Sequence, residues 1–408
     1  MRLLTVKNAA AKPLVPWWTA PGFTVNFNWL PSDCFWRNLY IHIPFCASKC
    51  GYCAFYSEIG TGALRRRAYL EKIVEYLRQI NFAEPLKTLY LGGGTPNFLT
   101  AAELEYLFEN IRKYVPMHSD CEISCEMNPE TLTPAKMQLI ASFVNRISLG
   151  VQSFDDAVRR KLMRRCSGQQ LQKALELIKQ YQIKHFNIDL IYGVNTVEWQ
   201  IFEQDLAKAL DWGVDHLSCY ALTAEENSIL GLHSPVADDE SSAQWWQKIG
   251  DYLAGKGMFR YEISNYARKG GICQHNKNVW QGDNLLGIGA AASGFNGRDR
   301  YTFDGNIDSF LRGEAPEIDS IPSQLRMLEI FAVNLRTVDG WEKSRWEKLY
   351  ANCWQPMLEL CRRASEKNPQ WWHITADEIK LQEAGLLFWD DVAVEVLDWS
   401  ELILAVNF

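Results

Sequence analysis

Strand-forming and helix-forming segments alternate along most of this 408-residue chain, and that alternation is the feature that most constrains its fold. Short runs rich in β-branched and aromatic residues predict strands at Leu39–Phe45, Thr88–Leu91, Cys121–Cys125, Arg146–Val151, His185–Ile191 and His216–Ala221. Helices are predicted between them at Arg65–Asn81, Ala101–Tyr114, Pro134–Phe143, Gln169–Tyr181 and Glu198–Trp212. Connections of this length join parallel strands, so the pattern predicts an α/β fold built as a partial or open βα barrel of six units.

The alternation ends near Gly270, and four regions are therefore expected. Residues 1–36 are predicted to form an N-terminal arm, 37–265 the partial barrel, 266–322 an extension and linker, and 323–408 a smaller C-terminal α+β domain of helical, winged-helix-like character. A further strand candidate lies at Arg260–Ile263. The segment Glu314–Ser323, with two prolines, reads as the linker. Thr100 and Thr133 occupy expected helix N-caps.

Composition excludes several classes of function. Hydrophobic residues make up 47% of the chain and charged residues 22%, which is typical of a soluble globular protein. No run approaches eighteen uncharged apolar residues, so no membrane span is expected. The first twenty residues lack the blocks of a signal peptide, which predicts a cytoplasmic location. A net charge of −7 argues against a broad nucleic-acid-binding face.

Three of the eleven cysteines stand apart from the rest. Cys46, Cys50 and Cys53 form a C-x3-C-x2-C motif directly after the first predicted strand, whereas the other eight are scattered. Three thiolates on a four-iron cluster leave one iron open for a small chelating ligand. A structural zinc site is the competing interpretation, but it requires a fourth ligand, and no suitably spaced partner pair follows.

This motif resembles that of the radical S-adenosylmethionine (SAM) superfamily. The resemblance implies a [4Fe-4S] cluster whose open iron chelates SAM, and cleavage of SAM to a 5′-deoxyadenosyl radical. The cofactors supply the difficult chemistry, while the protein positions them and excludes water.

Further motifs narrow the resemblance to the oxygen-independent coproporphyrinogen III oxidase group, and within it to the heme chaperone (HemW) branch. They are the Tyr40–Cys46 segment, Gly92–Pro96, Glu126–Pro129, Gly150–Phe154, Asn187–Gly193 and Tyr261–Tyr266. The oxidases usually carry a fourth cysteine two places after the third, where this chain has Phe55. Phe55 therefore favours a chaperone that binds heme and passes it to an acceptor over an oxidase that decarboxylates porphyrinogen propionates.

Candidate SAM-binding residues lie in or near the ends of the predicted strands, which form the active face of parallel barrels. By resemblance, Tyr40, Gly93, Gly94, Thr95 and Arg164 contact the cofactor. Glu126 and Asp189 are carboxylates after apolar runs that need polar partners, either a ribose or amino group of SAM or a buried base. Gln152 can donate and accept hydrogen bonds, and Tyr52 either lies against adenine or packs within its loop.

The resemblance also implies a heme ligand. A segment linked to heme binding in the chaperones, H-N-x-x-Y-W, reads here His275-Asn-Lys-Asn-Val279-Trp280. His275 is the expected axial ligand, with Cys273 as an alternative and a purely structural histidine as the competing interpretation. His42, on the same strand face as Tyr40, is expected to support the cluster site. The heme acceptor and the electron donor are not identified by the sequence.

Overall fold

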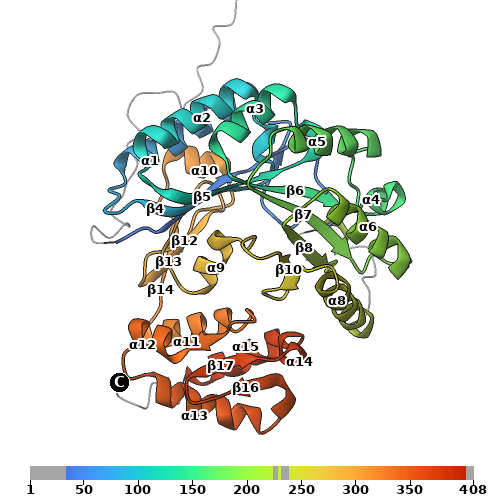
Figure 1. Ribbon diagram of the computed structural model, residues 1–408. Coiled ribbons are helices and arrows are strands. Elements are labelled where there is room, and N and C mark those ends of the chain that lie inside the picture. Colours follow the sequence, from blue (N-terminus) through green and yellow to red (C-terminus); the bar gives the residue numbers. More distant parts are fainter. Residues whose placement is uncertain (1–33, 224–227, 231–238, 401–408) are drawn as a thin grey trace, which may run out of the picture.

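A computed structural model of the chain describes residues 34–223, 228–230 and 239–400 (Figure 1). The predicted N-terminal arm thus lies almost wholly outside the described residues. Of its last three residues, Cys34 and Trp36 are buried in the main core. All eleven cysteines are free thiols in the structure. No helix within the described ranges is long and apolar enough to cross a membrane.

The six predicted strands are all present and lie side by side, in parallel, within a 12-stranded sheet. They are β1 (Asn38–Ile43), β4 (Leu86–Gly93), β5 (Met117–Met127), β6 (Arg146–Gln152), β7 (His185–Tyr192) and β8 (His216–Ala221). These strands neighbour one another in chain order, with Tyr40 opposite Tyr90 and Ile188 opposite Leu217. Because the strands are parallel, their carboxyl ends meet at one edge, which we call the mouth, and their amino ends at the other, which we call the foot.

The predicted crossover helices cover the outer face of this sheet (Figure 1). They are α1 (Ala63–Gln79), α2 (Ala101–Tyr114), α3 (Pro134–Phe143), α5 (Gly168–Gln180) and α6 (Trp199–Asp211). Thr100 and Thr133 cap α2 and α3 as predicted, each accepting a hydrogen bond from the third backbone amide of its helix. The sequence did not predict the short α4 (Asp156–Lys161) or α8 (Asp239–Ala254).

The sheet continues past the predicted barrel on the β1 side. Strand β11 (Leu285–Ile288) pairs in parallel with β1, and β12 (Ser293–Phe295), β13 (Asp299–Thr302) and β14 (Glu317–Ser320) follow in antiparallel order. Helix α10 (Ile307–Arg312) packs against α1. The prediction that Glu314–Ser323 is a linker was wrong, because Glu317–Ser320 pairs with β13 as an edge strand, and its prolines flank the strand instead of interrupting it.

The other edge of the sheet also differs from the prediction. The strand expected at Arg260–Ile263 is only the two-residue β9 (Phe259–Arg260), and it runs antiparallel to β10 (Asn265–Ala267), which in turn pairs antiparallel with β8. Residues 261–263 leave the ladder because Glu262 accepts hydrogen bonds from the Ser264 amide and the Asn265 side chain, which close a tight turn.

Helix α9 (Gln274–Trp280) lies on the opposite face of the sheet from α1, α2 and α3 (Figure 1). It contacts β1 and β4 on one side and α11 of the C-terminal region on the other. The concave face of the sheet is therefore closed at this point by a short helix that the sequence pattern did not reveal.

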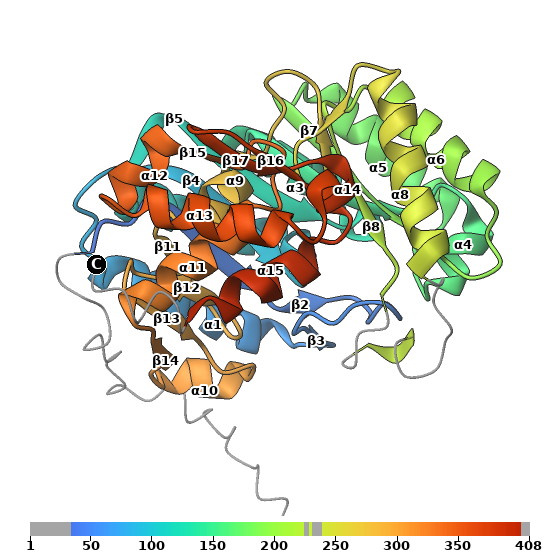
Figure 2. The same cartoon turned by 90° about the horizontal axis from the view of Figure 1, so that it is seen from below.

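The C-terminal region packs beneath α9 as a small mixed unit (Figures 1 and 2). Its sheet has the order β15 (Trp341–Glu342), β17 (Glu378–Leu381) and β16 (Trp372–Ile374). Its helices are α11 (Ser323–Asn334), α12 (Lys343–Leu349), α13 (Trp354–Ser365), α14 (Glu383–Leu386) and α15 (Trp389–Asp398). Arg336 joins it to the barrel through an ion pair, 2.8 Å long, with the fully buried Glu262.

Candidate functional site

The three motif cysteines lie on one loop at the mouth. Cys46 ends β2 (Phe45–Cys46), which pairs with β3 (Glu58–Ile59), and this pairing closes the loop that carries Cys50 and Cys53. The Lys49 ammonium donates to the Phe55 carbonyl at 2.5 Å and to the Ser57 hydroxyl at 3.1 Å, so it ties the two halves of the loop together. The β2–β3 pairing and the Lys49 hydrogen bonds therefore hold the cysteine loop together.

The loop is also fixed from outside. The Gly51 amide donates to the Leu162 carbonyl at 3.1 Å, and the Leu230 amide donates to the Gly51 carbonyl at 2.8 Å. A side chain at position 51 would collide with Leu230 and Met163, so glycine is required between the second and third cysteines. Segments following β6 and β8 thus hold the loop that follows β1.

The thiols have different neighbours. Cys46 lies 3.5 Å from the Thr95 hydroxyl, and Arg164 donates from Nη1 to Cys50 Sγ at 3.3 Å. Burial raises the pKa of Cys46 and of Cys53. Within the described ranges, no three His, Cys, Asp or Glu side chains converge tightly enough to hold a single metal ion.

His42 connects the cysteine loop to the strands beneath it. Its Nδ1 lies 2.9 Å from the Tyr40 hydroxyl and its Nε2 lies 3.1 Å from the Tyr56 carbonyl oxygen. Burial lowers the pKa of His42 to about 4, so the ring is neutral. An added Cβ at Gly93 would come within 2.5 Å of the His42 ring, and Gly93 has a φ of +106°. His42 and Tyr40 therefore share one strand face, as predicted, with Gly93 against the ring.

Glu126 has two well-defined partners at the end of β5. Its Oε1 accepts from the Tyr90 hydroxyl and its Oε2 from the Gly93 amide, each at 2.9 Å. Burial raises the pKa of Glu126 to about 7, and the nearby Asp189 adds to the shift. The partners of Glu126 are thus a tyrosine hydroxyl and a backbone amide. The alternative expectation, a buried ion pair between this carboxylate and a basic side chain, is not what the structure shows.

Asp189 lies on β7, which is separated from the β5 strand of Glu126 by β6. Ser148 donates to its Oδ2 at 2.9 Å and Asn187 to its Oδ1 at 2.7 Å. Burial raises the pKa of this carboxyl as well. Glu126 and Asp189 line a common cavity of about 50 Å³ inside the barrel, together with Ser124, Ser148 and Ser218. The interior is therefore polar and small.

Gln152 and Arg164 shape the wall between β6 and the thiol loop. Gln152 has a φ of +69°, a conformation that costs energy for any residue other than glycine. The register between β6 and β7 shifts at Gly150–Gln152, which re-aims this side chain. Arg164 donates from Nη2 to the Gly150 carbonyl at 2.5 Å, while its Nε is buried with no hydrogen-bond partner within the described ranges. An unpartnered buried donor beside Cys50 is a place for a polar ligand.

The remaining predicted cofactor residues are also at the mouth. Gly94 approaches the backbone of residues 43–45 so closely that a side chain would not fit, and Thr95 is buried beside Cys46. Tyr52 packs on a small apolar cluster of Val158, Leu162, Ile191, Val194 and Leu222. Packing within its loop was the alternative to a contact with adenine for this residue. The structure thus brings the predicted SAM-binding residues to the mouth or to the barrel interior beneath it, where Glu126 and Asp189 line a cavity that also reaches Arg146 and Cys273.

His275 lies at the opposite end. Its Nδ1 is 2.7 Å from the Thr88 hydroxyl, its ring lies 5.0 Å from that of Tyr90, and its amide donates to Glu122 at 2.9 Å. Thr88 precedes Gly93 by five residues on β4, which is roughly 16 Å at 3.3 Å per residue. His275 is only 5% exposed, and burial lowers its pKa to about 4. His275 is therefore buried and neutral, with its Nδ1 occupied by Thr88, and its expected role as a heme ligand stays a prediction.

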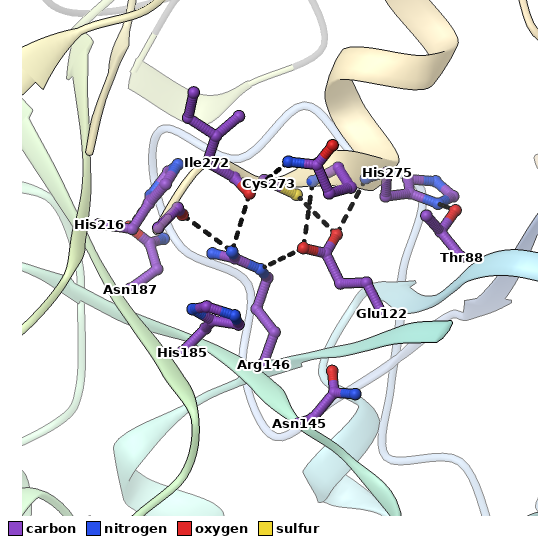
Figure 3. Close-up of polar contacts among 12 residues, drawn as sticks. Thr88, Glu122, Asn145, Arg146, His185, Asn187, His216, Ile272, Cys273 and His275 are labelled. Carbon is purple, nitrogen blue, oxygen red and sulfur yellow. Dashed lines mark hydrogen bonds and ion pairs between the residues drawn. The ribbon is translucent and has the colours of Figure 1, made fainter. Parts of the chain in front are cut away.

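Sequence reasoning missed the polar network that surrounds His275 at the foot (Figure 3). Arg146 donates to Glu122 at 2.9 Å and to the carbonyls of Gly271 and Ile272, and Glu122 also accepts from the Cys273 thiol and from the backbone of α9. Cys273 is therefore occupied too. Two charged residues within the predicted strands, Glu122 and Arg146, were the available signal, because buried charges require partners.

Comparison with known proteins supports this description. The family model described as "Radical SAM superfamily" matches residues 40–209. The curated "Heme chaperone HemW" of Escherichia coli (strain K12) is 35% identical over 277 residues, 66% of this chain and 72% of that protein. The protein of the same name from Haemophilus influenzae is 30% identical over 330 residues, 76% of this chain and 85% of that one.

Among solved structures, coproporphyrinogen III oxidase (HemN) from Escherichia coli, described as a radical SAM enzyme, superimposes with a TM-score of 0.75 over 89% of this chain and 90% of that chain. The sequence identity is 19%, so this likeness establishes the fold, including the partial barrel with its smaller C-terminal region, and not the activity.

Proposed function

Because the chain belongs to the HemW family within the radical SAM superfamily, we propose that it binds heme and passes it to an acceptor protein, with a [4Fe-4S] cluster and SAM held at the mouth of its barrel. Membership of the superfamily implies the cluster and SAM. Heme is the cargo named by the relatives and is the part of the proposal that requires a direct test.

The donor set fits the cluster. Cys46, Cys50 and Cys53 are the only cysteines on the mouth loop, and position 55, which would offer a fourth thiol, is a phenylalanine with 70% of its surface exposed. Arg164 donates from Nη1 to Cys50 Sγ at 3.3 Å, which fixes the position of this thiol on the loop. When bound, the cluster supplies an electron and an open iron that chelates the amino and carboxylate groups of SAM.

The neighbouring residues fit SAM. Arg164, whose Nε has no hydrogen-bond partner within the described residues, lies beside the cysteine loop, and the carboxyls of Glu126 and Asp189 line the polar cavity inside the barrel. The carboxyls accept hydrogen bonds from hydroxyl or ammonium groups, and the guanidinium donates to a carboxylate. We assign Tyr40, Tyr52, Thr95 and Gln152 to the walls of this site, where they orient the ligand and exclude water.

The chaperone function is favoured over the oxidase on one observation: relatives named heme chaperone HemW share 30–35% identity over most of their length, whereas the oxidase shares the fold at 19%. Phe55 agrees with this choice, since the residue that replaces the usual oxidase cysteine points into solvent and offers no ligand. A radical decarboxylation of coproporphyrinogen III remains the second candidate to be tested in parallel.

Three anaerobic measurements test the proposal. Reconstitution should give about four irons per chain with absorption that bleaches on reduction, and the Cys46→Ala/Cys50→Ala/Cys53→Ala variant should lose it. Heme should then bind to the reconstituted protein and transfer to an apo-acceptor. Incubation with coproporphyrinogen III, SAM and a reductant should give no vinyl product. Vinyl product without heme transfer would establish the enzyme and refute the chaperone.

A further inference from the structure

The buried guanidinium of Arg146 is only partly used by the protein. Arg146 is 2% exposed; its Nε donates to Glu122, and its Nη2 donates to the carbonyls of Gly271 and Ile272. Its Nη1 is buried and has no hydrogen-bond partner among the residues that the structure describes. A buried donor without a partner costs free energy, and a ligand that accepts from it recovers that cost. Nη1 therefore marks a place for an acceptor.

Arg146 forms part of the wall of the polar cavity inside the barrel. In Figure 3, the end of its guanidinium remote from Glu122 faces Asn187 and His216, which line the same cavity. Burial lowers the pKa of His216 to about 3, and the charge of Arg146 adds to this shift, so the His216 ring is neutral. Arg146 thus supplies the positive charge on this side of the cavity.

A second unused polar group lies next to Arg146. Ser124 is opposite Arg146 in the β5–β6 register, is 1% exposed and lines the same cavity. Its hydroxyl oxygen is buried and has no hydrogen-bond partner in the described part of the chain. Glu122, the counterion of Arg146, also accepts from two backbone amides of α9, so it does not depend on Nη1. A guanidinium and a hydroxyl both donate to a carboxylate, so the two groups together suit an anion.

The acidic groups of the cavity lie nearer the mouth. Glu126 is opposite Ser148, two residues beyond Arg146 on β6. Asp189 is opposite Gly150, four residues beyond Arg146. At about 3.3 Å per residue, these positions are roughly 7 Å and 13 Å further along the strand. The cavity therefore has an acidic end toward the proposed SAM site and a basic end toward the foot.

The size of the cavity limits what can enter it. Its volume is about 50 Å³, and a water molecule takes up about 30 Å³, so a group the size of a carboxylate fits whereas a tetrapyrrole ring stays outside. Tyr220 in its wall is 43% exposed, so the cavity reaches the surface. Cys273 and Asn276, at the start of α9, also line it. An arm bound in the cavity therefore lies beside α9.

We infer that the foot-side half of this cavity is a subsite for a carboxylate arm, which accepts hydrogen bonds from Arg146 Nη1 and Ser124 Oγ. Heme carries two propionates, so under the proposed chaperone function, on which this inference rests, the arm is one propionate of the cargo. The subsite anchors a side chain of the macrocycle and not its iron, so the role expected of His275 is unaffected.

Comparison of heme with heme dimethyl ester, whose propionates carry no charge, tests the subsite in the full-length, anaerobically reconstituted protein. Titrations followed by Soret absorption give both affinities. The wild type should bind the ester about tenfold more weakly than heme, because a carboxylate accepts charged hydrogen bonds that an ester does not replace.

Two variants remove the donors one at a time. Ser124→Ala deletes a hydroxyl that has no partner within the described residues, so it should weaken heme binding about threefold at unchanged thermal stability. Arg146→Lys keeps a positive charge for Glu122 but removes Nη1, and it should weaken heme binding about tenfold. Both variants should bind the dimethyl ester as the wild type does. Arg260→Lys is the matched control, because Arg260 is also a buried arginine in an ion pair, with Glu383, but does not line the cavity.

The outcomes separate this inference from the function on which it rests. If the wild type binds no heme, the chaperone function is refuted, and the propionate subsite with it. If the wild type binds heme and its ester equally well, or if both variants bind heme as tightly as the wild type, the chaperone function stands and the subsite is refuted. If Arg146→Lys lowers thermal stability more than Arg260→Lys does, Ser124→Ala decides. An effect of Ser124→Ala that persists in full with the dimethyl ester would also overturn the subsite, because the hydroxyl would then not act on the carboxylate.

Discussion

Arg164 donates hydrogen bonds from one guanidinium nitrogen to the Cys50 thiol and from another to the Gly150 carbonyl, at 3.3 Å and 2.5 Å. One side chain thus links the proposed cluster ligand to the end of β6. The remaining nitrogen, Nε, is buried and has no hydrogen-bond partner within the described residues. Arg164 is therefore placed to act on both cofactors at once.

Replacing Arg164 with glutamine should lower the reduction potential of the reconstituted cluster and weaken SAM binding. A nearby cation stabilises the more negative, reduced form of a cluster, and its loss disfavours reduction. A redox titration followed by electron paramagnetic resonance, with and without SAM, measures both effects. Arg363→Gln on the exposed side of α13 is the control. A potential equal to that of the wild type would show that the guanidinium does not act on the cluster.

Glycine at position 93 is required for two reasons that can be separated. Gly93 has a φ of +106°, and a Cβ there would lie 2.5 Å from the His42 ring. Gly213 also has a positive φ, +77°, but a Cβ there would contact nothing within 4 Å. Gly213→Ala should cost about 1 kcal/mol of unfolding free energy from backbone strain alone.

Gly93→Ala should cost about 3 kcal/mol or more, because displacement of the His42 ring adds to the strain. It should also weaken SAM binding, whereas Gly213→Ala should not. Chemical denaturation and SAM titration measure the two effects. Equal destabilisation by the two substitutions would mean that His42 moves aside without cost.

The sequence predicted which residues lie together at the mouth but not how the foot is assembled, for a physical reason. The mouth residues carry local signals, since Cys46, Gly93 and Glu126 lie within short motifs at the ends of strands. The foot is assembled from distant positions: Glu122 and Cys273 are 151 residues apart. Helix α9 has seven residues and owes its position to tertiary contacts with β1, β4 and α11, which no local periodicity encodes.

The same distinction explains the wrong linker and strand predictions. The segment containing Glu317–Ser320 has no alternating apolar pattern, and all four residues are exposed, because an edge strand requires only backbone pairing. The Arg260–Ile263 segment does have the pattern of a strand, but the Glu262 side chain caps the turn and pairs with Arg336 across the domain boundary. A contact formed only in the folded chain overrides the local preference.

The ion pair between Glu122 and Arg146 should carry much of the stability of the foot. Both side chains are less than 10% exposed, and the guanidinium also binds two carbonyls that lead into α9. Glu122→Gln leaves a buried guanidinium without its counterion, which should cost about 3–5 kcal/mol of unfolding free energy.

Urea denaturation measures this cost, and hydrogen exchange of the amides of residues 274–280 reports the opening of α9. The cluster should still assemble, since the cysteine loop lies at the other end of the strands. Glu130→Gln, at a carboxylate with no ion pair in the described part of the chain, provides the control. Loss of the cluster in Glu122→Gln with α9 still protected would contradict the assignment of the pair to the foot.

Glu126 should make stability depend on pH in the opposite sense to an ordinary surface carboxylate. Burial raises its pKa from 4.5 to about 7 in the folded protein. Its neutral form therefore stabilises the fold fully below pH 4.5, and this contribution is lost as the pH rises toward about 7. Glu126→Gln keeps a neutral side chain at every pH, so its unfolding free energy should fall less than that of the wild type over this range.

The difference between the two proteins should grow by about 2 kcal/mol between pH 5 and pH 8, since one pKa unit corresponds to 1.36 kcal/mol. Denaturation curves at half-unit pH steps measure it, with Glu130→Gln as the control that should follow the wild type. Bound SAM with its ammonium group near Glu126 would instead favour the ionised carboxylate and flatten the wild-type curve. A wild-type profile that is insensitive to SAM would place the ligand's ammonium group away from Glu126.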